Sequence, residues 1–208
     1  MSPQVDLRLA ELLCARLCHE LVSPVGAINN GVELLSEDEA DFLKDAVSLI
    51  GQSARKAGQR LQFYRMAYGA SVGASVSGGD PADLLAGLFE GGRTGLNWQP
   101  EANALPRDWQ RLACNLAVLV AEFLPRGGTV TVAMKDSSSA NPAIIVGGEG
   151  AALNPLEEMA EGLAGGIANP DLTTRNVHAA FTSGLAEYLG ARVTVEKINA
   201  NSFALIAE

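Results

Sequence analysis

The chain has 208 residues, of which 48% are hydrophobic and 19% charged, a composition typical of a globular protein with one large domain or two small ones. The formal net charge is -9 with only 15 lysines and arginines, so we expect no basic face for direct binding of nucleic acid. No apolar run reaches the roughly 20 residues that cross a bilayer, and no signal-peptide pattern is visible, so we expect a cytoplasmic protein without membrane contact.

Three cysteines, Cys14, Cys18 and Cys114, are consistent with a reducing compartment and are expected to be small buried side chains. A metal site formed by Cys14, Cys18 and His19 is excluded by geometry, because Cys14 and His19 point about 140° apart on a helix. We therefore expect no intrinsic metal or cofactor.

Helical periodicity dominates the first third of the chain, which is predicted to be one unit spanning residues 1–70. A first helix is expected from about Val5 to Ser36, with Pro24 causing a kink, and a second from about Glu39 to Tyr68. Two long helices joined by a tight turn form a helical hairpin. A single hairpin cannot bury the apolar stripes of both helices, so we predict a homodimer in which two hairpins form a four-helix bundle.

A Gly/Ser-rich linker is predicted at 71–79, followed by a second unit at 80–208. The expected elements are a capped helix from Asp80 to about Phe89, a strand at Leu96–Gln99, an apolar helix at Asp108–Leu124, strands at Thr129–Lys135 and Ala143–Val146, helices at Leu156–Leu163 and Asn176–Leu189, and a strand hairpin at Ala191–Ile198 and Ser202–Ala207. This order predicts an α+β fold, a sandwich with helices on one face of a mixed sheet.

His19 is the residue of the first helix that carries the clearest chemical signal. The apolar stripe of that helix points about 120–180° away from it, so the imidazole is expected to lie outside the core. Its neighbours on the same face are mostly small, and two are apolar, which is typical of a docking surface. These neighbours are Leu12, Ala15, Arg16, Val22, Ser23, Gly26 and Asn30. An ordinary exposed histidine remains the alternative.

The chemistry of phosphoryl transfer suits this position. A histidine imidazole is mostly uncharged near pH 7, so it can attack a phosphoryl group without a separate base. Glu20 could hydrogen-bond the other ring nitrogen, Ser23 could orient a water or the phosphoryl oxygens, and Arg16 could offset the phosphoryl charge. His19, Glu20 and Ser23 are therefore the candidate catalytic residues.

Residues 19–28 (HELVSPVGAI) resemble the H-box of histidine kinases. The longer run at 15–35 (ARLCHELVSPVGAINNGVELL) is similar to the alphaproteobacterial histidine phosphotransferase family typified by ChpT, and the resemblance extends over nearly the whole chain. It implies a dimeric hairpin bundle followed by a degenerate ATPase-like sandwich of the GHKL (Bergerat) type. It also implies a phosphorelay, in which phosphorylated His19 passes phosphoryl groups between aspartates of response-regulator receiver domains, from a hybrid-kinase donor to downstream regulators. The partner receiver would hold the Mg²⁺.

The second unit distinguishes a kinase from a relay protein. Residues 111–123 resemble the kinase N-box with Asn115 at its first asparagine, but Leu119 stands where the second would bind magnesium. The stretch at 144–150 (IIVGGEG) lacks the aspartate that reads adenine, and residues 176–179 replace the glycine-rich lid. We therefore expect that ATP is neither bound nor hydrolysed, and that Asn115→Ala barely alters transfer.

Receiver specificity is expected to come from residues around His19 and from the second helix, namely Leu12, Ala15, Arg16, Val22, Gly26, Phe63 and Tyr64. His178 is expected to be a surface or core-edge residue without a role in the chemistry. Two alternatives remain open: an autophosphorylating histidine kinase with an unusual ATP site, and a non-catalytic adaptor that binds receiver domains.

Overall fold

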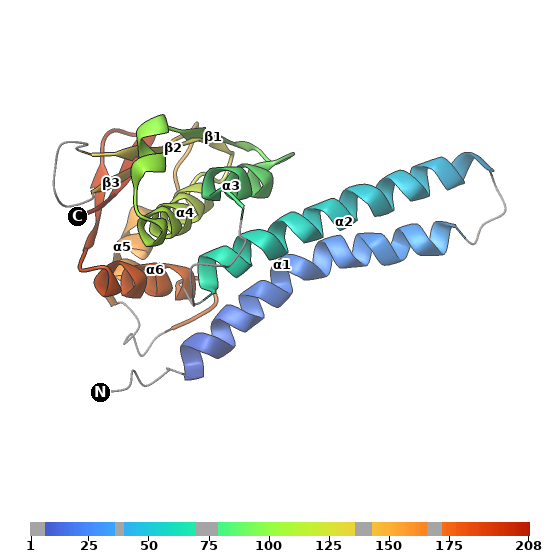
Figure 1. The fold of residues 1–208 in the computed structure, drawn as a ribbon, viewed down its shortest axis with the longest axis horizontal. Coiled ribbons are helices and arrows are strands. Elements are labelled where there is room, and N and C mark those ends of the chain that lie inside the picture. The colour runs from blue at the N-terminus through green and yellow to red at the C-terminus, as the bar shows by residue number, and fades with distance from the viewer. Residues whose placement is uncertain (1–6, 36–39, 70–78, 136–142, 166–171) are drawn as a thin grey trace.

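The computed structural model describes residues 7–35, 40–69, 79–135, 143–165 and 172–208. A long helical hairpin projects from an α/β domain that contains the C-terminus (Figure 1). In chain order the elements are α1 (Leu7–Leu34), α2 (Ala40–Tyr68), α3 (Pro81–Phe89), β1 (Thr94–Trp98), a 3-10 helix (Pro100–Ala104), α4 (Arg107–Glu122), β2 (Gly128–Met134), β3 (Ile144–Glu149), α5 (Leu156–Gly165), α6 (Val177–Tyr188), β4 (Val193–Lys197) and β5 (Ser202–Ala207). Apart from Gly79, the predicted linker lies outside the described residues.

Helix α1 runs without a break through Pro24, although its axis changes direction along its length (Figure 1). Proline lacks an N–H group, and its ring collides with the carbonyl of the residue four positions earlier. In α1 this residue is Glu20, so the helix itself offers no N–H donor for the Glu20 carbonyl.

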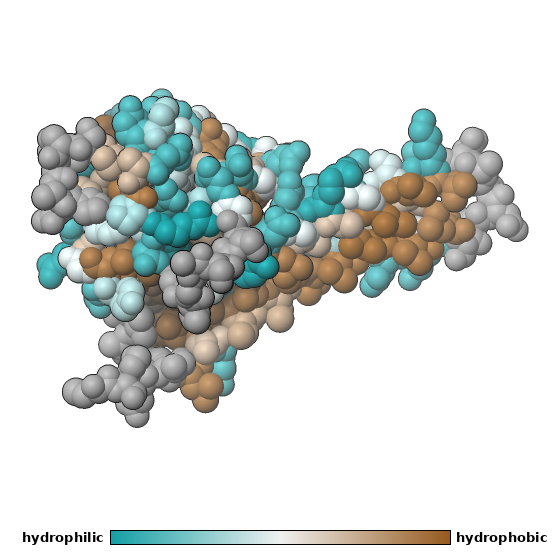
Figure 2. Space-filling view, viewed as in Figure 1, coloured by the Kyte–Doolittle hydropathy of each residue, from teal (hydrophilic) through white to brown (hydrophobic). Residues whose placement is uncertain are grey.

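Helices α1 and α2 pack side by side as an antiparallel hairpin (Figure 1). Their closest approach uses Gly31, where an added Cβ atom would lie 2.6 Å from Cγ1 of Ile50. One side of the hairpin stays open, and Figure 2 shows an apolar band along it. The large apolar side chains exposed on the hairpin include Val22, Val25, Val32, Leu43, Val47 and Leu61. Cys14 and Cys18 are exposed as well, so their expected burial is wrong for the single chain, whereas Cys114 is buried.

The domain is built on a mixed five-stranded sheet with the order β1-β2-β3-β5-β4. Strand β1 is parallel to β2, and the other neighbours are antiparallel. Helix α4 packs on β2, β3 and β5, and α5 packs on β4, so helices cover one face of the sheet as predicted. Helix α4 comes very close to β3, because a Cβ atom at Gly148 would lie 2.6 Å from Cγ1 of Val120.

The hairpin is anchored in the core of this domain. Every residue of α4 from Leu112 to Val120 is buried, and the last turns of α2 add Phe63, Tyr64 and Ala67 to the same core. Helix α2 contacts α3 and α4, while α1 contacts α6. No helix in the described ranges is long and apolar enough to span a membrane.

Candidate functional site

The His19 side chain projects from α1 with 88% of its surface exposed. Its Nδ1 atom lies 4.0 Å from Oε1 of Glu20, which is long for a hydrogen bond but close enough for the carboxylate to attract the ring N–H. Nε2 lies on the opposite edge of the ring. The Glu20 carboxylate therefore lies on the Nδ1 side of the ring.

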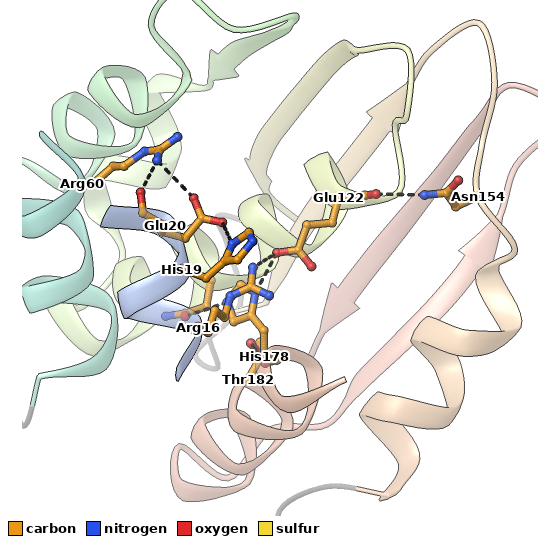
Figure 3. A network of polar contacts seen from close by, with 9 residues as sticks. Arg16, His19, Glu20, Arg60, Glu122, Asn154, His178 and Thr182 are labelled. Carbon is orange, nitrogen blue, oxygen red and sulfur yellow. Dashed lines mark hydrogen bonds and ion pairs between the residues drawn. The ribbon is translucent and has the colours of Figure 1, made fainter. Parts of the chain in front are cut away.

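Arg60 of α2 reaches across the hairpin to the residue after His19 (Figure 3). Its guanidinium donates a hydrogen bond to the backbone carbonyl of Glu20 and lies 3.5 Å from the Glu20 carboxylate. Both side chains are about one-third exposed. This contact was not predicted from the sequence.

Arg16, one turn before His19, is turned towards the C-terminal domain. Its guanidinium forms an ion pair and hydrogen bond with Glu122 at the end of α4 (Figure 3). Burial acts to lower the pKa of Arg16, but the charge and hydrogen bond of Glu122, together with Tyr68 and Tyr64, outweigh burial and raise it. In this arrangement Arg16 neutralises Glu122, so its expected role in offsetting phosphoryl charge would require the ion pair to open.

The face of α1 around His19 is divided into two parts. Leu12 is 6% exposed and packs with Leu172, Val177 and Ala180, so its predicted contact with a receiver is wrong for this arrangement. Ala15, Val22 and Ser23 are exposed, and Gly26 is partly exposed. His19 therefore lies at the boundary where α1 leaves the C-terminal domain.

Phe63 and Tyr64 do not share this open face. They are 1% and 5% exposed, and both belong to the main hydrophobic core. Their predicted role as receiver contacts is wrong, because the last turns of α2 are covered by the C-terminal domain.

A polar network links the hairpin to the domain beneath Arg16. Glu122 Oε1 lies 3.3 Å from Nδ1 of His178, and Nε2 of His178 lies 3.2 Å from Oδ1 of Asn115. The amide nitrogen of Asn115 donates to the carbonyls of Ala67 and Arg111, which fixes its oxygen towards His178. His178 is 1% exposed, so the expected surface or core-edge position is wrong.

Protonation within this network follows from burial and hydrogen bonding. Burial lowers the pKa of His178, and the Glu122 carboxylate offsets this only in part. Burial would raise the pKa of Glu122, but the hydrogen bond and charge of His178, together with Arg16, outweigh burial and lower it. Glu122 is therefore a carboxylate at neutral pH, paired with Arg16 and facing Nδ1 of His178.

The residues that resemble a nucleotide site serve packing in this fold. Asn115 and Leu119 are fully buried in α4. The side chain of Asn115 is hydrogen-bonded to the end of α2 and to His178. Residues 147–149 form part of β3 rather than a loop. No group of three or more His, Cys, Asp or Glu side chains suited to a metal ion occurs in the described part of the chain.

The chain is similar to known phosphotransferases over most of its length. Residues 78–201 match the family model described as the histidine phosphotransferase C-terminal domain. Over 191 residues the chain is 35% identical to protein phosphotransferase ChpT of Brucella abortus (strain 2308), covering 91% of this chain and 90% of that protein. The chain belongs to the histidine phosphotransferase family.

A solved structure of a bacterial phosphotransferase supports the same assignment. It matches this histidine phosphotransferase with a TM-score of 0.78 and 32% sequence identity, over 99% of this chain and 98% of that one. The match spans the hairpin and the α/β domain together, so the arrangement of the two parts is shared with a phosphotransferase of known structure.

The contacts of three polar residues of this histidine phosphotransferase were not predicted from the sequence: Arg60, Glu122 and the buried His178. Glu122 carried a signal, because it is the only charged residue between Leu112 and Leu124 in a helix predicted to be buried. Arg60 carried a weaker signal, since a proline at position 24 implies that the Glu20 carbonyl needs a donor from elsewhere. His178 carried none that distinguishes it from an ordinary surface histidine.

Proposed function

We propose that this histidine phosphotransferase carries phosphoryl groups between aspartates of response-regulator receiver domains, with His19 as the phosphorylated residue. The observation that supports this role is the 88% exposure of the His19 side chain within an H-box sequence. Glu20 and Ser23 assist it as catalytic residues, one beside Nδ1 and the other exposed one turn further along α1.

The reaction consists of two substitutions at phosphorus. The Nε2 lone pair of His19 attacks the phosphorus of an aspartyl phosphate, an N–P bond forms, the O–P bond breaks, and the donor aspartate leaves as a carboxylate. The ring proton on Nδ1 faces Glu20, which stabilises the positive charge that develops on the ring. An acceptor aspartate then attacks the phosphoramidate and restores the free histidine.

The charge on the transferred group also needs a cation. The receiver is proposed to supply Mg²⁺, so that this chain contributes the nucleophile and the docking surface without a cofactor of its own. Because receiver domains of this kind are cytoplasmic signalling proteins, we place this chain in the cytoplasm.

Receiver docking is assigned to the open part of α1 around His19. Ala15 and Val22 are exposed there, and Val22 has 69% of its surface free for an apolar contact. An added Cβ atom at Gly26 would meet nothing within 4 Å, so packing within this chain does not require a glycine there. The missing side chain leaves room for a partner. The C-terminal domain adjoins this surface through Leu12 and Arg16 and would extend it.

A homodimer is proposed on the evidence of the open apolar band of the hairpin (Figure 2). Along α2 the apolar positions alternate by four and three residues, the spacing of a helix seam that packs against another helix. These positions are Leu43, Val47, Ile50, Ala54, Ala57 and Leu61. Two such bands would close into a four-helix bundle and remove the exposed apolar area from water.

Transfer from a phosphorylated receiver tests the proposed function. We expect wild-type protein to take up the phosphoryl group as an acid-labile modification, and His19→Ala to take up none, because no other described residue presents a free imidazole. Asn30→Ala is the matched control, since Asn30 is exposed on the same face of α1 three turns further along. Circular dichroism of the two variants checks that the fold is kept.

Two results would contradict the proposal. Acid-labile label from ATP and Mg²⁺ in the absence of a receiver would indicate an autophosphorylating kinase. Unchanged output of a reconstituted relay with His19→Ala would indicate an adaptor that only binds receivers.

A further inference from the structure

Arg60 makes contacts beyond those expected of an arginine on the surface of the hairpin. Its guanidinium contacts two different acceptors of one residue, the backbone carbonyl and the side-chain carboxylate of Glu20 (Figure 3). Glu20 directly follows His19 in α1, while Arg60 lies 40 residues later in α2. A single side chain of α2 thus fixes both the backbone and the carboxylate beside His19.

The backbone contact answers a need created by Pro24. In an α-helix the carbonyl of residue 20 accepts a hydrogen bond from the N–H of residue 24, and proline has none. A carbonyl that is withdrawn from water without a donor is costly, and a charged donor satisfies it better than a neutral one. Arg60 supplies this donor from the neighbouring helix.

The carboxylate contact reaches His19 through one further step. Glu20 Oε2 lies 3.5 Å from Arg60, and the other oxygen, Oε1, lies 4.0 Å from Nδ1 of His19. A glutamate side chain that is not held by a partner samples several rotamers and spends little time beside the ring. The guanidinium therefore keeps the negative charge on the Nδ1 side, which favours a proton there and a free lone pair on Nε2.

We propose that Arg60 is a positioning residue for phosphoryl transfer: it replaces the hydrogen bond lost at Pro24 and holds Glu20 so that Nε2 of His19 faces the phosphoryl donor. This role rests on the proposed function of His19. Both contacts are made by Nη1, which carries two N–H groups and is held in the rigid plane of the guanidinium.

A double-mutant cycle tests the backbone contact without any phosphotransfer. Pro24→Ala restores an N–H at position 24, so the Glu20 carbonyl regains a donor within α1. Arg60→Met should lower the folding equilibrium constant of the otherwise unchanged protein about tenfold, and clearly less in the Pro24→Ala background. Equal losses in both backgrounds would overturn the backbone role. Urea unfolding followed by circular dichroism supplies the equilibrium constants.

Nitrogen-15 NMR of the imidazole tests the link to His19. In wild-type protein at neutral pH we expect His19 shifts that indicate a proton mainly on Nδ1, and in Arg60→Met a shift towards the Nε2 proton that predominates in free histidine. Arg60→Lys should give an intermediate spectrum. Arg55→Met is the matched control, because Arg55 is an exposed arginine of the same helix, and it should leave the spectrum unchanged. Identical spectra for wild type and Arg60→Met would overturn the positioning role.

Kinetics of transfer from a phosphorylated receiver complete the test. Arg60→Met should reduce kcat roughly tenfold or more with little change in KM, since the nucleophile is misplaced while the docking surface is kept. A rise in KM alone would overturn the proposal and assign Arg60 to receiver binding. Failure of wild-type protein to accept phosphoryl groups would instead contradict the proposed function, while the unfolding and NMR results would still report on the Arg60 contacts.

Discussion

Glu122 is the last residue of α4 and the only charged residue of this helix after Arg111, and basic groups from two other elements converge on it. Arg16 comes from α1 and His178 from α6, so one carboxylate joins α1 to the C-terminal domain. About two thirds of the Glu122 side chain is covered, so a charge without a partner at this position would be costly. The Arg16–Glu122 ion pair is therefore expected to contribute more to stability than an exposed salt bridge does.

Glu122→Gln is expected to lower the free energy of unfolding by about 2 kcal/mol at pH 7, because Arg16 then loses its charged partner. The pKa of Glu122 is lowered in the folded state, so its contribution is complete above the ordinary pKa of a glutamate and is lost as the pH falls through the folded value. The difference between wild type and variant should shrink below about pH 4. Chemical unfolding at a series of pH values from about 3 to 8 measures this difference in the free energy of unfolding.

Glu187→Gln serves as the control for this series, since Glu187 is an exposed acid on α6. We expect its unfolding free energy to follow that of wild type at every pH. A Glu122→Gln variant that also follows wild type would show that the contact with Arg16 contributes nothing to stability.

At the scale of elements, local sequence signals were sufficient to locate the helices and strands. Asp80 caps α3 through a hydrogen bond to the Ala82 N–H, and the Asp-Pro pair that predicted this start lies at its first turn. The alternating run that predicted a strand at Thr129–Lys135 forms β2 at Gly128–Met134. Such signals depend on a few neighbouring residues, so a single sequence contains them.

The choice of partner for each helix face could not be predicted in the same way. Periodicity placed Leu12 on the same face of α1 as His19, but Leu12 is buried because α6 lies against that part of α1. Phe63 and Tyr64 are likewise buried under residues far away in the sequence. A hydrophobic repeat of 3.6 residues identifies one face of a helix. Which element packs against that face depends on tertiary structure.

Asn115 illustrates how the structure changes an expectation derived from a lost motif. Its amide joins α4 to the last turn of α2 through the Ala67 carbonyl and to α6 through His178. Asn115→Ala is therefore expected to cost about 1–3 kcal/mol of stability, because these buried groups lose their partner. The expectation from the sequence that Asn115→Ala barely alters transfer concerns activity rather than stability, and it stays a prediction.

Thermal and urea unfolding of Asn115→Ala measure this loss, with Asn97→Ala as the control at an exposed position of β1. Equal stability of the two variants would mean that the contacts of Asn115 with α2 and α6 contribute nothing. Transfer activity should fall only in conditions where the variant begins to unfold.

At the scale of the whole molecule, the open band on the hairpin predicts self-association. Val47→Glu places a charge in the seam of α2, where Val47 is 57% exposed in the single chain, and should convert a dimer into a monomer at micromolar concentration. Size-exclusion chromatography with light scattering gives the mass. Gln52→Glu, on the opposite side of α2, should stay dimeric, and a monomeric wild-type protein would refute the bundle.

The burial of the last turns of α2 restricts how the two parts of this molecule can move. Swinging the domain away from His19 would expose Phe63, Tyr64 and Ala67, each packed in the common core, at a cost of several kcal/mol by the area they bury. His19 and the adjoining surface of the C-terminal domain are therefore preorganised, so a receiver that binds there does not have to order them. We therefore expect transfer to proceed without opening of a hinge between the hairpin and the domain.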